Sequence, residues 1–67
     1  MYLDKFQKMD PIMLMSIINM KLRNEFNGNL DELVKTYSID LHALEKKLID
    51  SGFTFNKALG KFLPVSN

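Results

Sequence analysis

The segment from Asp10 to Phe26, DPIMLMSIINMKLRNEF, constrains the fold of this chain more than any other. Asp10 is a favourable N-cap, because its carboxylate can accept a hydrogen bond from a free backbone N–H group of the first turn. Pro11 suits the first helical position, where a backbone N–H group would have no partner. Asn27 and Gly28 then stop the helix, because glycine adopts the left-handed cap conformation without strain. The segment therefore predicts one helix that ends near Phe26.

The apolar residues of this helix do not keep to one side. At about 100° per residue, one arc of roughly 160° forms a stripe wide enough to face a core. That stripe consists of Ile12, Leu14, Met15, Ile18, Leu22 and Phe26. Met13, Ile17 and Met20 fall on the other side of the helix. Because a helix that is apolar all round must be covered all round, this second line needs a partner inside or outside the chain.

Start and stop signals predict two further helices. Asn29 is an N-cap for a short helix of about residues 30–37, and an acidic residue three positions later completes a relative of the capping box. Asp40 caps a third helix, which Ser51 and Gly52 end. The apolar stripe predicted for this third helix consists of Leu41, Leu44, Leu48 and Ile49.

The hydrophobic period then changes from helical to alternating. Residues 53–55, Phe-Thr-Phe, and residues 61–63, Lys-Phe-Leu, each alternate as strands do. Between them, Asn56 and Gly60 bracket a loop that suits a hairpin closed by a left-handed residue. Pro64 stops the second strand or marks it as an edge.

These elements predict a mainly α-helical, single domain covering residues 1–67. Residues 1–9 form an N-terminal arm, residues 10–52 form three helices, and residues 53–63 form a C-terminal β-hairpin. Two helices joined by a tight turn and packed on a preceding helix give the helix-turn-helix arrangement. A hairpin directly after the third helix occupies the position of a wing. The predicted architecture is therefore a small three-helix, winged-helix-like domain.

Composition limits the classes of protein that are possible. The chain has no cysteine, which excludes a disulfide framework and a thiolate metal site. The longest run without a charged residue, residues 11–20, is too short for a membrane span of about 20 residues. The N-terminal residues carry acids and a proline where a signal peptide needs an apolar core. We therefore expect a cytoplasmic protein.

The sequence offers no set of residues for catalysis or for a cofactor. His42 is the single histidine, and its acidic neighbours Asp40 and Glu45 are explained by helix capping and surface charge. The acidic residues are spread along two helices without the spacing of a calcium loop, and no phosphate-binding loop or catalytic motif is present. We predict no enzymatic activity, no metal, no cofactor and no small-molecule ligand.

Two functions remain. We favour a protein-interaction module, most simply a homodimer, that assembles partly through Met13, Ile17 and Met20, because so small a core gains much from a second chain. In the other interpretation of these three apolar residues, the N-terminal arm and the hairpin cover them within the same chain.

The alternative function is nucleic-acid binding by the third helix and the hairpin. Its candidate contacts are His42, Lys46, Lys47, Lys57 and Lys61. The charge count weighs against it, because residues 29–52 hold three lysines and five acidic residues, whereas a groove-reading surface needs clustered Lys and Arg.

The run Asp10-Pro11-x-Met13-Leu14-x-Ser16-x-Ile18-Asn19-x-Lys21-Leu22-Arg23 resembles the start of a family of very small bacterial proteins. That family is classified as a domain of unknown function (four-two-five-zero). Later segments, at residues 30–33, 39–40, 44–48 and 52–55, also resemble it. Here Met15 replaces a leucine and Asn24 stands where aspartate is commoner. The resemblance implies a bacterial source and the same compact fold, and it implies no activity.

Asn19 is the polar residue of this motif that falls inside the wide apolar arc. A polar side chain placed there needs a hydrogen-bond partner. We predict a bond to a loop carbonyl that fixes the register of the hairpin or the arm, in preference to ligand binding.

Overall fold

Three helices and a hairpin make up the fold, as predicted. The computed structural model describes residues 6–65 of the chain. The first helix is α1 (Pro11–Lys21), which continues directly into a π-helical segment, η2 (Leu22–Phe26). There follow α2 (Leu30–Thr36), α3 (Leu41–Asp50), β1 (Phe53–Asn56) and β2 (Lys61–Pro64).

Each α-helix begins at the side-chain cap that the sequence predicts. Asp10 accepts a hydrogen bond from the backbone N–H of the third residue of α1, at 3.0 Å. Asn29 does the same for the third residue of α2, at 3.2 Å. Asp40 accepts from the second and third residues of α3, at 3.0 and 3.4 Å. Local chemistry therefore sets the three starting points, independently of how the helices pack.

The end of the first helix differs from the prediction in its geometry. The chain does end its helical course at Phe26, but from Leu22 onward it widens into a π-helical turn. The N–H groups of Asn27 and Gly28 both bond to the carbonyl of Leu22. Both residues are left-handed, with φ of 56° and 83°, so the cap begins one residue earlier than expected.

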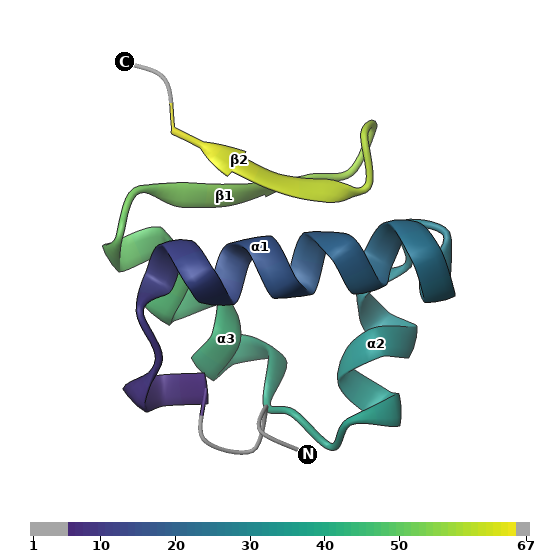
Figure 1. The fold of residues 1–67 in the computed structure, drawn as a ribbon, viewed down its shortest axis with the longest axis horizontal. Coiled ribbons are helices and arrows are strands. Elements are labelled where there is room, and N and C mark those ends of the chain that lie inside the picture. Colours follow the sequence, from purple (N-terminus) through teal and green to yellow (C-terminus); the bar gives the residue numbers. More distant parts are fainter. Residues whose placement is uncertain (1–5, 66–67) are drawn as a thin grey trace.

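The molecule is arranged around α1 (Figure 1). The hairpin lies along one side of this helix, and α2 and α3 lie on the other side. The strands pair antiparallel, with Phe55 opposite Phe62. Among residues 6–65, ten buried apolar side chains form one core: Phe6, Leu14, Ile18, Leu22, Leu30, Leu33, Val34, Leu44, Leu48 and Phe62.

Two isoleucines that the sequence assigns to core-facing stripes are on the surface. Ile12 of α1 is 61% exposed and Ile49 of α3 is 53% exposed. The prediction is wrong because α1 is rotated about its axis so that Lys21, and not Ile12, turns toward the core. On α3, only Leu44 and Leu48 are fully buried, so the stripe there is narrower than the sequence pattern indicated.

The predicted N-terminal arm is described from Phe6 onward. Residues 6–8 form one 3₁₀ turn, and Phe6 is buried in the core. Lys47 of α3 donates a hydrogen bond from Nζ to the carbonyl of Gln7 at 3.0 Å. The predicted cover of α1 by Tyr2 and Leu3 concerns residues that lie outside the described part of the chain.

The hairpin loop has the predicted construction, and its tip contacts the end of the first helix. Gly60 is left-handed (φ 68°), its N–H bonds to the carbonyl of Asn56, and the Asn56 side chain accepts from the N–H of Leu59. Gly60 lies directly against Gly28: a Cβ added to Gly60 would stand 2.8 Å from the Gly28 Cα atom. Two segments that are far apart in sequence thus meet backbone to backbone.

We expect Gly60→Ala to destabilise the fold by more than Gly52→Ala. Both glycines have positive φ, so both substitutions carry a left-handed strain of about 1–2 kcal/mol. A Cβ on Gly52 meets nothing within 4 Å, whereas one on Gly60 must push the Gly28 backbone away. The Gly60→Ala variant should therefore lose about 1–3 kcal/mol more unfolding free energy than the Gly52→Ala variant. Urea unfolding monitored by circular dichroism measures this difference. Equal losses for the two variants would show that the contact is not a tight one.

Candidate functional site

The side chain of Asn19 joins α1 to the hairpin. Its Nδ2 donates to the carbonyl of Phe62 at 3.0 Å, and its Oδ1 accepts from the N–H of Phe62 at 2.7 Å. These two backbone groups face outward from the two-stranded sheet, where a third strand would otherwise bond to them. The carboxamide therefore takes the place of a neighbouring strand. The predicted bond from Asn19 to a backbone carbonyl of the hairpin is present, but that carbonyl lies in strand β2 and not in a loop, and the Asn19 side chain also accepts a bond from the same residue.

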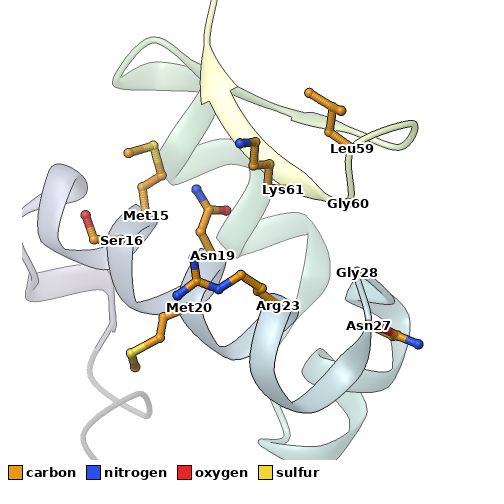
Figure 2. A pocket seen from close by; sticks show the side chains of 10 residues that line it. All are labelled: Met15, Ser16, Asn19, Met20, Arg23, Asn27, Gly28, Leu59, Gly60 and Lys61. Atoms are coloured by element: carbon orange, nitrogen blue, oxygen red, sulfur yellow. The ribbon is translucent and has the colours of Figure 1, made fainter.

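A groove lies between the outer side of α1 and the hairpin tip, next to this pair of bonds (Figure 2). Its volume is about 640 Å³. Its small and polar lining comes from Ser16, Asn19, Asn27 and the two contacting glycines, Gly28 and Gly60. The amide of Asn19 is already occupied by Phe62, so its place at the groove is structural.

The remaining lining residues are cationic or apolar. Arg23 and Lys61 supply the two positive charges, and Met15, Met20 and Leu59 supply apolar surface. Among residues 6–65, no acidic side chain lines the groove. Figure 2 shows Arg23 reaching along the helix toward Asn19, with Lys61 of the hairpin on the other side of the Asn19 side chain in this view. Met20 and Leu59 are 44% and 62% exposed, so the groove has two apolar side chains open to solvent.

The predicted self-association residues lie partly on the surface. Met13 is 58% exposed and Met20 is 44% exposed, whereas Ile17 is half-buried and packs against the core. Ile12, which the sequence placed in the core, joins the two methionines on the outside. The outward side of α1 thus presents three large apolar side chains, and Met20 belongs both to this side and to the groove.

The two hairpin lysines of the nucleic-acid alternative line different hollows. Lys61 lines the groove beside α1. Lys57 lines a second hollow of about 470 Å³, together with the acidic side chains of Asp31 and Glu45. The two lysines therefore face different electrostatic surroundings.

The candidates on α3 are partly engaged within the chain. Lys46 forms an exposed salt bridge with Asp50, with 3.4 Å between Nζ and Oδ2. Lys47 donates to the carbonyl of Gln7. His42 is an exposed residue in the first turn of α3.

Sequence reasoning missed a polar cluster around Lys21. The side chain of Lys21 is only 11% exposed, and its Nζ lies 3.5 Å from Oε2 of Glu25 and 5.0 Å from the centre of the Tyr37 ring. The Tyr37 hydroxyl donates to the other oxygen of Glu25 at 3.2 Å. The i,i+4 spacing of Lys21 and Glu25 is readable in the sequence as a helical ion pair, but the third member, Tyr37, comes from the residue that directly follows α2.

This cluster changes the titration of the lysine. Hydrogen bonding with Tyr37 raises the pKa of Lys21 above its ordinary value of 10.5, and Glu25 raises it further, while burial acts in the opposite direction. The ammonium form is therefore the one that the folded state favours. The cluster ties η2 to α2 near the cap at residues 27–28.

The sequence of the chain matches the family described as "Domain of unknown function (DUF4250)" over residues 8–62. The chain belongs to the DUF4250 family. No curated protein and no solved structure matches it. Of the polar residues in the opening motif of this DUF4250 chain, Ser16, Asn19 and Arg23 line the groove and Lys21 points to the core. Polar residues of the motif therefore lie on the groove-facing side of this first helical stretch as well as on its core-facing side.

Two findings concern the described residues of this DUF4250 chain as a whole. Within residues 6–65, no helix combines the length and apolar character that a membrane crossing requires. Within the same residues, no three side chains of the metal-binding types His, Asp or Glu come together.

We expect Asn19→Ala to destabilise the fold strongly. The substitution leaves the N–H and carbonyl of Phe62 without their partners. This should lower the free energy of unfolding by about 1–3 kcal/mol for each group that stays buried. Asn24→Ala is the matched control, since Asn24 is exposed near the end of the same helical stretch and its side chain accepts a hydrogen bond from its neighbour Arg23, at 3.4 Å. Thermal and urea unfolding of both variants measure the difference. A loss below about 0.5 kcal/mol for Asn19→Ala, which is the range of ordinary surface substitutions, would mean that the hairpin docks without these bonds.

We expect a pH dependence that Lys21→Met removes. Because the folded pKa of Lys21 lies above the unfolded value of 10.5, its stabilisation is fully present below pH 10.5 and is lost as pH rises through the folded pKa. The difference in unfolding free energy between wild type and Lys21→Met should be constant near neutral pH and should shrink above pH 10.5. Lys46→Met, at a largely exposed ion pair, controls for general loss of a helical lysine. A constant difference at all pH values would contradict the assignment.

Proposed function

We propose that this chain is a cytoplasmic, non-enzymatic protein-interaction module that forms a homodimer through the outward side of α1. The observation that carries the proposal is the exposure of Met13 and Met20 beside Ile12 on one helix. Contiguous exposed apolar side chains on a small domain mark interaction surfaces more often than isolated ones do. Methionine is suited to such a surface, because its unbranched side chain adapts to a partner.

The size of the core supports a second chain as the partner. Ten apolar side chains are buried among the described residues, and a domain of about 60 residues buries only about 60% of the surface that its unfolded chain exposes. Association of two folded copies therefore adds stability that increases with the logarithm of protein concentration. The outward side of α1 offers the same surface on both copies, which is what a two-fold symmetric contact requires.

The test replaces the two exposed methionines. We expect the wild-type chain to sediment as a dimer at tens of micromolar, and Met13→Glu combined with Met20→Glu to sediment as a folded monomer, because four carboxylates would be buried at the seam. Circular dichroism should remain unchanged, since both positions are exposed in one copy and glutamate is a good helix former. Ile17 is left intact because its contact with the core would mix folding with association.

Ile49→Glu is the matched control for the dimer test. It introduces the same charge at an exposed isoleucine, 53% accessible, on α3, and it should leave the dimer intact. A wild-type chain that stays monomeric over the whole concentration range would refute the homodimer. So would dissociation of the Ile49→Glu variant to the same extent as the double variant.

A further inference from the structure

We propose that the groove between α1 and the hairpin tip binds an acidic segment of a partner protein, with Arg23 and Lys61 holding a carboxylate side chain. This site is a second proposed binding site, in addition to the homodimer surface on the outward side of α1. The groove is lined within a single copy, so a monomeric chain is sufficient to bind the segment. The partner is defined by chemistry: a carboxylate next to an apolar side chain.

The charges of the groove favour an anion. In the part of the chain that the structure describes, its lining has two cationic side chains and no acidic one. The Arg23 side chain is hydrogen-bonded from Nε to Oδ1 of Asn24, and within residues 6–65 the two terminal amino groups of its guanidinium have no hydrogen-bond partner. A guanidinium fork matches the two oxygens of a carboxylate, and a nearby ammonium adds a second charge-assisted bond.

The backbone segments that carry the two cations are held in place by the fold. Arg23 belongs to η2, and Lys61 is the residue before Phe62, whose backbone Asn19 binds on both sides. The contact of Gly28 with Gly60 fixes the tip of the hairpin against the helix end. A site whose two walls are fixed before binding spends little free energy on ordering them.

The apolar side chains decide the kind of anion. Met20 and Leu59 flank the cations and are 44% and 62% exposed, so an apolar neighbour of the carboxylate would be buried between them. The groove also continues through Met20 onto the apolar outward side of α1. Nucleic acid fits less well, because a phosphate backbone is bound by several clustered cations, and the whole chain has a net charge of +1.

The experiment is a selection followed by nuclear magnetic resonance. A random octapeptide display library is selected on the wild-type chain, and we expect enrichment of Asp or Glu beside Leu, Met or Phe. A synthetic peptide of the enriched sequence should then shift the backbone resonances of Ser16, Arg23 and residues 59–62. Arg23→Gln with Lys61→Gln should weaken its binding about fivefold or more, as expected for two partly exposed ion pairs, and added salt should weaken it further.

The controls separate this site from general charge attraction. Lys8→Gln with Lys35→Gln removes the same charge at two exposed positions outside the groove and should leave binding unchanged. Equal weakening by both double variants would overturn the proposal, and so would equal binding of the peptide with Asn or Gln in place of its acids. Failure to enrich acidic sequences would also overturn it. Tighter binding of inorganic phosphate or duplex DNA at the same resonances would assign the groove to a different ligand.

Discussion

The two hydrogen bonds between Asn19 and Phe62 are the constraint on which the rest of the structure depends. A two-stranded hairpin is at best marginally stable in water and needs another surface. Here α1 supplies that surface, and Asn19 satisfies the outward N–H and carbonyl of Phe62. The ring of Phe62 can then be buried to 1% exposure, in edge-on contact with Phe55. Without this amide, the second strand would present two unpaired polar groups to an apolar helix.

The same bonds explain why a short helix is apolar on more than one side. One side, with Leu14, Ile18 and Leu22, fills the core. A second side meets the hairpin through Asn19. A third side, with Met13 and Met20, is open in the single copy. The excess apolar character is therefore divided between the fold and an outward surface, and Met20 belongs to both proposed binding regions, so occupancy of the groove and self-association would compete.

Local features of the fold were predictable from the residues themselves. The caps Asp10, Asn29 and Asp40 act within three residues, so their effect depends on no distant contact. The hairpin loop is equally local, with Asn56 and Gly60 in the predicted roles. The need of Asn19 for a partner also followed from its place in an apolar arc. The sequence did not predict that this partner is Phe62, because Phe62 is 43 residues away along the chain.

Other features depend on how the elements pack, and the sequence could not supply them. A hydrophobic pattern gives the width of a stripe but not the rotation of the helix, so Ile12 was assigned to the core and Lys21 was not. The burial of Lys21 requires Tyr37, the residue that caps the end of α2, and the groove requires Lys61 from β2. The sequence by itself therefore determined where each helix and the hairpin begin, since capping and turn chemistry act over a few bonds. Only the tertiary structure decided which side of α1 is covered, because that depends on the meeting of Asn19 with Phe62 and of Gly28 with Gly60.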